Sequence, residues 1–277
     1  MKYGYIATNF GYCGDARTLV ELAKLAEDSG WDCFFTSDHI HYPGHEPAAD
    51  PWVALAAVAV STERILLGPM VTPLPRRHLA KLAREATTLD HLCGGRLILG
   101  VGSGGPALPE YTDFGDFGDA KTRAAMLDEG LGVLRALWSG EAVDHHGQHY
   151  TVVTEGFARP VQRPGIPIWV AATWPHKKPL RRAARWDGVY PMHRDTMKGH
   201  MFTRDELSEL VAYVSEHRTN DGPYDVCTFG MTSGPDDTST VGAYAEVGAT
   251  WWHDFSVPWL TSLDEVRARL RKGPPRV

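Results

Sequence analysis

The sequence has few cysteines, no basic excess and no long apolar run. Its four cysteines among 277 residues form no CxxC pair, which predicts separate thiols in a reducing compartment rather than a disulfide framework. A formal net charge of -6 argues against nucleic acid as a partner, because phosphate binding favours a basic surface. Residues 1–7 are too short an apolar run for a signal peptide or a membrane span, so we expect a cytoplasmic protein with no membrane partner.

The signatures of nucleophilic catalysis are also missing, and the one apparent dinucleotide motif lacks its context. No GxSxG turn occurs, and no cysteine has matching partners. Residues 100–105 match GxGxxG, but Pro106 and Pro109 follow where a dinucleotide-binding fold would begin a helix. Two explanations remain: a loop stripped of side chains so that a planar ring or phosphate approaches the backbone, and a turn that needs glycine for itself.

What the sequence does contain is a regular alternation of strand and helix patterns. Apolar segments of strand length occupy residues 3–8, 32–36, 65–71, 96–101, 166–172, 188–192, 226–232 and 250–256. Helical patterns between them cover residues 51–62, 78–92, 121–138, 179–186, 204–216 and 240–247, with further helices near 19–26 and 262–270. A hairpin turning at Gly147 interrupts the rhythm at residues 142–153.

This alternation predicts one (β/α)8 barrel over residues 1–277, for which the length is typical. Three pairs of residues fit helix-starting capping boxes: Thr18 with Glu21, Thr203 with Glu206, and Ser262 with Glu265. An open, doubly wound sheet is the alternative fold.

In a barrel the active site lies where the strands run into their following loops. The segments at those positions are rich in glycine, small polar and aromatic residues: Asn9–Phe10, Ser37–His39, Pro69–Pro73, Gly102–Gly105, Ala172–Trp174 and Met192–His193. Such a rim suits a flat cofactor with polar edges. Proline inside the strand at Pro69 removes a ladder donor, so we expect distorted backbone there.

Asp38 and His39 are the candidate catalytic residues. Imidazole titrates near neutral pH, which makes His39 the best proton donor or acceptor, with Asp38 orienting it or contacting the cofactor ring. A capping Asp beside a surface His is the bland alternative. A metal-dependent barrel hydrolase is another, with Asp38, His39, His41 and His193 as ligands.

Many short segments, in order, resemble the luciferase-like monooxygenase family. They include Asp50–Ala56, Thr62–Gly68, Leu79–Asp90, Gly94–Gly102, Leu137–Trp138, Gly147–Tyr150, Pro160–Gln162, Ile166–Val170 and Ala183–Gly188. The resemblance extends over roughly residues 3–256.

The resemblance implies a barrel that holds FMN, or alternatively the deazaflavin F420, at the carboxyl ends of its strands, and acts on a small organic substrate. It also implies a non-proline cis peptide near the third strand, matching the Pro69–Met70 bond here, a homodimer and, for an FMN enzyme, a separate flavin reductase. The implied cofactor-binding residues are Asp38, Pro69, Met70, Thr72, Gly102, Ser103, Gly104, Ala171, Ala172 and Thr173.

One departure concerns proton transfer. Some F420-dependent relatives carry a catalytic glutamate just after the fourth-strand glycines, where this chain has Gly105. We therefore interpret the chain as an FMN- or F420-dependent oxidoreductase or monooxygenase, with Tyr111 and Trp174 as expected walls of the substrate site. A non-catalytic cofactor carrier on the same barrel is the remaining alternative.

Overall fold

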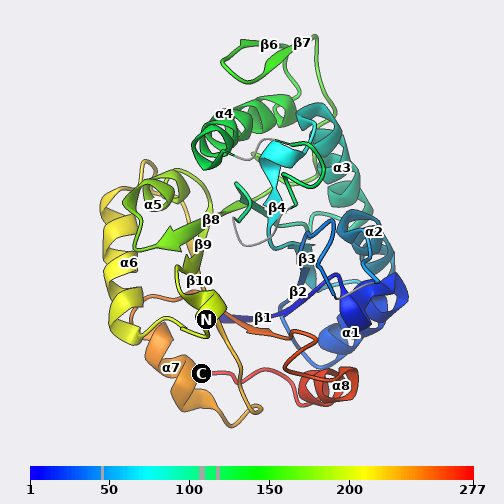
Figure 1. The fold of residues 1–277 in the computed structure, drawn as a ribbon, viewed down its shortest axis with the longest axis vertical. Helices are drawn as coiled ribbons and strands as arrows, with labels where there is room; N and C mark the ends of the chain where they lie inside the picture. The colour runs from blue at the N-terminus through cyan, green and yellow to red at the C-terminus, as the bar shows by residue number, and fades with distance from the viewer. Residues whose placement is uncertain (45–46, 106–109, 117–118) are drawn as a thin grey trace.

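Parallel strands form a ring in the computed structural model, with the helices outside it (Figure 1). The structure describes residues 1–44, 47–105, 110–116 and 119–277. The ring strands are β1 (Lys2–Ala7), β2 (Cys33–Thr36), β3 (Leu66–Pro69), β4 (Thr72–Pro73), β5 (Leu99–Gly102), β8 (Ile168–Trp174), β9 (Gly188–His193), β10 (Asp225–Gly230) and β11 (Trp251–Phe255). They are hydrogen-bonded in the order β3-β2-β1-β11-β10-β9-β8-β5-β4.

The two ends of this order meet through β3. The Leu67 N–H donates to the Arg96 carbonyl at 3.0 Å, and the Ile98 N–H donates to the Leu67 carbonyl at 2.9 Å. The ring is therefore nearly closed, which confirms the predicted barrel and excludes the open sheet. The fourth barrel strand begins later than expected, at Leu99, with Leu97 contributing only an isolated bridge.

The third predicted strand, residues 65–71, is divided into β3 and β4. A non-proline cis peptide separates them, at Met70–Val71. The expected position, Pro69–Met70, was wrong by one residue: Pro69 still pairs with Thr36 in the β2–β3 ladder, so the chain departs from the strand only after it.

The helices are α1 (Ala16–Asp28), α2 (Pro51–Ser61), α3 (Leu79–Leu92), α4 (Ala120–Trp138), α5 (Lys177–Ala183), α6 (Arg204–Glu216), α7 (Thr238–Ala245) and α8 (Leu263–Arg271). Short 3-10 helices cover Gly11–Gly14, Leu74–Arg76 and Thr196–Lys198. α5 and α7 begin and end two to three residues before the predicted ranges. One apolar cluster packs the helices onto the ring, and a second fills its interior.

Local capping explains where several helices begin. The predicted boxes at Thr203 and Ser262 are both present, each with its glutamate bonded back to the cap. The box at Thr18 was wrong, because Asp15 caps α1 one turn earlier by accepting the Arg17 N–H.

The predicted hairpin is formed by β6 (Val143–His146) and β7 (Thr151–Thr154), which project beyond α4 (Figure 1). The Glu129 carboxylate holds it by accepting from the backbone of His149 and Tyr150 and bonding to the His145 ring. The histidines of this hairpin therefore lie outside the barrel.

All four cysteines are buried thiols without a disulfide. Within the described residues, no helix combines the length and apolar character that crossing a membrane requires.

Candidate active site at the carboxyl ends of the strands

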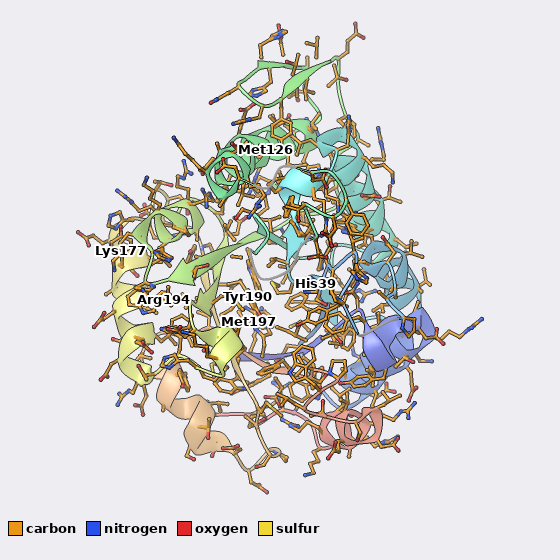
Figure 2. The ribbon with its side chains drawn as sticks, in the orientation of Figure 1. His39, Met126, Lys177, Tyr190, Arg194 and Met197 are labelled. Atoms are coloured by element: carbon orange, nitrogen blue, oxygen red, sulfur yellow. The ribbon has the colours of Figure 1, made fainter. Side chains whose placement is uncertain are left out.

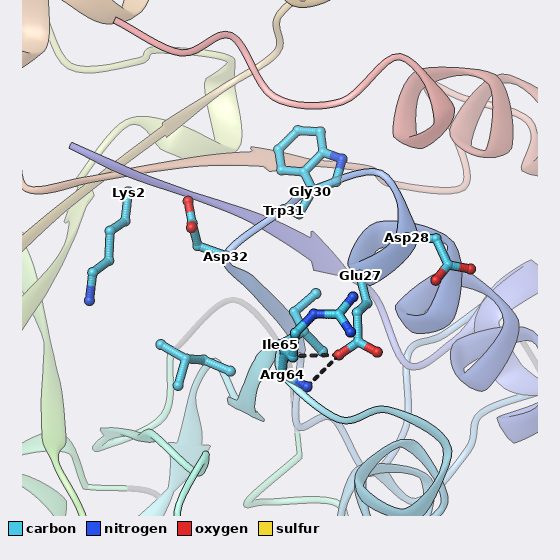
Figure 3. Close-up of a pocket in the computed structure, with 9 residues that line it drawn as sticks. Lys2, Glu27, Asp28, Gly30, Trp31, Asp32, Arg64 and Ile65 are labelled. Atoms are coloured by element: carbon cyan, nitrogen blue, oxygen red, sulfur yellow. Dashed lines mark hydrogen bonds between the residues drawn. The ribbon is translucent and has the colours of Figure 1, made fainter.

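A hollow of about 530 Å³ lies at the amino-terminal end of the barrel, beside the first residues of β1, β2 and β3 (Figure 3). Its main acidic group, Glu27, accepts backbone N–H groups from Glu63, Arg64 and Ile65 at 2.7–3.1 Å. That carboxylate fixes the entry of β3, so this hollow is a structural feature of the barrel, and the reactive groups have to be sought at the carboxyl ends.

Asp38 follows β2 and is almost completely buried, with its side chain 1% exposed. Arg77 donates to both carboxylate oxygens at 2.7–2.8 Å, and Arg76 donates to one of them at 3.0 Å. Thr72 and Trp52 donate to the same carboxylate at 2.7 and 3.2 Å. Four donor side chains therefore surround Asp38, which fixes the chain between β2 and β4 and leaves its carboxylate little capacity for a further ligand.

Asn9, at the end of β1, holds the backbone of His39. Its amide nitrogen donates to the carbonyls of His39 and Ala49 at 2.7 and 2.8 Å. Its amide oxygen accepts from the Ser37 hydroxyl at 2.8 Å and from the His39 N–H at 3.2 Å. The buried side chain thus uses its full hydrogen-bonding capacity to position the loop that carries His39.

His39 is paired with a glutamate that no sequence pattern indicated. Its Nδ1 lies 3.0 Å from Oε2 of Glu110, and the two side chains are 30% and 9% exposed. Figure 2 labels His39 at the inner edge of the ring, on the side of β2. Because an ionised carboxylate only accepts, Nδ1 carries a proton, and whenever the ring is neutral its lone pair lies on Nε2.

The surroundings of Glu110 favour its ionised form. Burial raises its pKa, but the hydrogen bond and charge of His39, the charge of Arg76 and the Ile40 N–H outweigh burial and lower it. Oε1 accepts from the Ile40 N–H at 2.6 Å and lies 3.1 Å from Arg76. Glu110 and Arg76 therefore connect His39 to the Asp38 cluster.

Glu110 lies five positions after Gly105, the position at which some F420-dependent relatives carry a glutamate and this chain does not. No periodicity or motif marks Glu110, because the segment that carries it belongs to neither a helix nor a strand. The available signal was chemical: an acidic residue after β5, in the region where some F420-dependent relatives carry a glutamate.

The predicted cofactor loop lies across the ends of β4, β5 and β8. A Cβ on Gly102 would lie 3.1 Å from Val71 and 3.4 Å from Ala171, so glycine leaves the backbone bare here and forms a shelf with its small neighbours. Gly104 has φ +75°, and a Cβ there would meet the Tyr111 ring at 2.4 Å. A flat ring system fits such a shelf of backbone and small side chains.

Other predicted residues divide between the shelf and the core. Ser103 and Thr173 are half-buried at the shelf. Thr72 donates to Asp38, Ala172 packs against the helices, and Met70 lies in the barrel interior, beyond Pro69.

Of the two residues expected to form walls of the substrate site, Tyr111 lies near the shelf. The Tyr111 hydroxyl donates to the Ser103 carbonyl at 3.0 Å, and the Arg123 guanidinium covers its ring at 4.4 Å. Burial raises the pKa of Tyr111 to about 12, so this hydroxyl stays protonated. Trp174 as a wall was wrong: its alternation along β8 places it among the outer core residues, covered by Lys177.

A group of three aromatic residues, Phe10, Tyr42 and Trp259, lies beside His39. The Phe10 and Tyr42 rings stack with centroids 4.2 Å apart, and Trp259 stacks on Tyr42 at 5.5 Å. The His39 ring meets Phe10 and Tyr42 edge-on, at 5.7 and 5.6 Å. These three residues follow β1, β2 and β11, which are neighbours in the ring.

The metal-dependent hydrolase alternative is not supported. Within the described ranges, the ligand atoms that gather closely enough for an ion are those of His193, His200 and Glu206, and they do not include Asp38 or His39. Glu206 already serves as the capping residue of α6, accepting from Thr203, and both histidine rings lie within 3.4 Å of it.

The comparisons with known proteins agree with this arrangement. The family model described as luciferase-like monooxygenase matches residues 1–255. The chain is 41% identical over 182 residues to an F420-dependent glucose-6-phosphate dehydrogenase of Beutenbergia cavernae, covering 63% of this chain and 52% of that protein. A protein of the same name from Nocardia farcinica is 40% identical over 165 residues, covering 57% and 48%. The chain therefore spans about half the length of these curated relatives.

Solved structures share the fold at low identity. An F420-dependent secondary alcohol dehydrogenase, solved with an F420-acetone adduct, superposes with a TM-score of 0.79 at 17% identity, covering 99% of this chain and 98% of that one. The F420-dependent tetrahydromethanopterin reductase of Methanopyrus kandleri gives a TM-score of 0.77 at 17% identity, covering 98% of each chain.

Proposed function

This chain belongs to the luciferase-like monooxygenase family, and we propose that it is an F420-dependent oxidoreductase that transfers hydride to or from a small organic substrate. The observation that carries the proposal is the His39–Glu110 pair, which stands at the carboxyl ends of the strands beside a shelf of backbone and small side chains. The two curated relatives described above are both named for F420, which favours the deazaflavin over FMN, our first expectation from sequence.

The shelf residues would hold the cofactor: Gly102, Ser103, Gly104, Ala171 and Thr173, beside the Met70–Val71 peptide. A bound deazaflavin supplies the hydride acceptor or donor, which is chemistry that amino-acid side chains lack. Asp38 and Thr72 act indirectly, by fixing the backbone that would support the cofactor ring.

His39 performs the proton transfer. When a substrate alcohol is oxidised, its carbon–hydrogen bond breaks and the hydrogen leaves with both electrons as hydride, while the hydroxyl proton passes to Nε2 of His39. The carbonyl product forms, and Glu110 stabilises the imidazolium that results, at 3.0 Å from Nδ1. The reverse reaction uses the same groups in the opposite order.

We also propose a homodimer in a reducing compartment. Val53 and Val60 are 69% and 66% exposed on α2, two turns apart on one face, as in an unpartnered apolar stripe. Four unpaired thiols fit a reducing cytoplasm. A separate flavin reductase belongs to the FMN alternative only. Light scattering of the wild type and of Val53→Lys tests the dimer.

Titration of the purified protein with oxidised F420 and with FMN, followed by fluorescence, tests the function directly. We expect micromolar binding of F420 and weaker binding of FMN. Gly102→Val should weaken F420 binding at least tenfold, because its side chain fills the shelf, whereas Gly132→Val on α4 has no atom within 4 Å of its Cβ and should bind normally. Equal, weak binding of both cofactors by the wild type would overturn the proposal.

A further inference from the structure

The loops around the mouth of the barrel divide into two unlike halves. The half after β4, β5 and β8 carries the glycine and alanine shelf and the exposed Phe114, while the half after β10, β11, β1 and β2 carries several large apolar side chains. Exposed members of the second half are Ile40, Met231, Trp259 and Leu260, at 45–61% exposure. Exposed apolar side chains on the loops of this half favour an apolar ligand over a charged one beside His39.

Specific contacts hold the aromatic residues of this half together. Gly11 has φ +65°, and a Cβ there would lie 2.7 Å from Pro258, so glycine is what allows the segment after β11 to approach β1. The Tyr12 and Thr261 hydroxyls, 3.2 Å apart, join the same two segments. The result is Trp259 stacked on Tyr42, with rings tilted by 28°.

The floor beneath this half is also apolar. Tyr190 and Phe229 stack at 5.7 Å, and Phe255 meets Phe229 edge-on at 5.9 Å. Met192 and Phe255 pack against the same interior cluster while remaining partly exposed. A substrate lying between the floor and the Tyr42–Trp259 pair would meet rings and thioethers rather than charges.

Four cations of the mouth are already engaged, and a fifth, Arg194, lies 3.7 Å from the Asp195 carboxylate. Arg76 and Arg77 are bound by Asp38, and Lys198 is bound by Asp195 at 2.7 Å. Lys177 rests over the rings of Trp174 and Tyr213, at 4.6 and 4.2 Å. A phosphate dianion would have to displace these partners, which makes a sugar phosphate a poor fit among the described residues.

We propose that Tyr42 and Trp259 form a binding site for a planar aromatic ring, so that the substrate is an uncharged aryl alcohol or ketone with its oxygen at His39. This assignment rests on the proposed function for the chemistry, but not for the ring site itself. It separates this protein from the glucose 6-phosphate that its curated relatives are named for.

Saturation-transfer NMR on the protein without cofactor tests the ring site. The probes are 1-phenylethanol, 1-cyclohexylethanol, which has the same carbinol without an aromatic ring, and glucose 6-phosphate. We expect transfer to the phenyl protons, at least threefold less to the cyclohexyl compound, and none to glucose 6-phosphate. Equal transfer to both alcohols, or stronger transfer to glucose 6-phosphate, overturns the site.

Variants locate the site. Trp259→Ala should lower affinity for 1-phenylethanol about tenfold, since aromatic pairing and buried ring area together have that magnitude, and Trp259→Phe should restore most of it. Phe114→Ala is the matched control, because Phe114 is also exposed (53%) but follows β5, on the shelf half. Equal loss in Phe114→Ala, or no loss in Trp259→Ala, contradicts the assignment.

Steady-state kinetics with F420 distinguish failure of the proposed function from failure of the ring site. Trp259→Ala should raise KM for 1-phenylethanol about tenfold with kcat and F420 affinity nearly unchanged. If F420 fails to bind while the Trp259-dependent NMR signal persists, the proposed function is wrong and the ring site stands. If F420 binds and glucose 6-phosphate is the better substrate, the ring site is wrong and the proposed function stands.

Discussion

The two ends of the barrel use charged side chains in different ways. At the amino end they bond to main-chain groups: Arg96 donates to the carbonyls of Ala59, Thr62, Ile65 and Cys93. At the carboxyl end they bond to one another, as Asp38 with its two arginines and His39 with Glu110 do. A side chain that saturates main-chain groups fixes the fold, whereas the His39–Glu110 pair leaves Nε2 of the ring for chemistry.

Asp90 gives a second case at the amino end. Its carboxylate accepts from the backbone of Val161 and Gln162 and from the Gln162 amide, which in turn donates to the Leu97 carbonyl. One acidic side chain thereby joins the end of α3, the segment before β8 and the entry to β5.

Four of the nine segments that revealed the family contain charged or amide side chains of this amino end: Asp90, Arg96, Gln162 and Asp187. Asp187 accepts the Ile168 N–H at the entry to β8. Part of the resemblance therefore reports how the barrel is held together. Glu110, which contacts the histidine proposed to react, lies in none of those segments.

The sharpest test of this contrast is His39→Ala. Loss of a positioned acid–base group should lower kcat about 10²- to 10³-fold, with little change in melting temperature. His146→Ala on the hairpin is the control, since its side chain is 69% exposed and far from the mouth. Turnover within twofold of wild type would remove His39 from the mechanism.

Arg96→Met should lower stability and leave activity unchanged, the reverse of His39→Ala. It leaves four carbonyls without their charged donor, so we expect a loss of about 3 kcal/mol in the free energy of unfolding, measured by urea denaturation. The kcat of the folded fraction should be unchanged. The exposed Arg64→Met, at the same end, should cost little. A large fall in kcat for Arg96→Met would blur the distinction between the two ends.

Glu110→Gln tests the pairing inside the active site. The amide oxygen can still accept the Ile40 N–H, but the charge that favours the His39 imidazolium is lost, so kcat should fall about tenfold. A kcat within twofold of wild type would mean that Glu110 only supports the loop.

Glu27→Gln should have the smallest effect, with a pH dependence of known sign. Burial raises the pKa of Glu27, but the three backbone N–H donors lower it overall. Its contribution, about 1–2 kcal/mol, is therefore present above the unfolded pKa of about 4.3 and lost as pH falls through the lower folded value.

Urea denaturation at several pH values checks this. The gap between wild type and Glu27→Gln should be full at pH 7 and should shrink below about pH 4.3. Glu63→Gln, an exposed carboxylate at the same end, should match wild type throughout. A gap that stays constant with pH would assign the effect to packing rather than to charge.

The sequence by itself determined the barrel, because strand and helix periodicities and capping boxes are local signals. It also placed His39 at the mouth, since position after a parallel strand follows from order along the chain. It did not determine which groups surround each side chain: Asp38 looked reactive from its position, yet four donors enclose it.

Only the tertiary structure brought Glu110 to His39, across 71 positions, and Trp259 to Tyr42, from the two ends of the chain. Such contacts depend on how irregular loops fold over the ring. Loops have no periodicity to read, so the residues that decide the chemistry become visible only when the strands have closed and set the loops side by side.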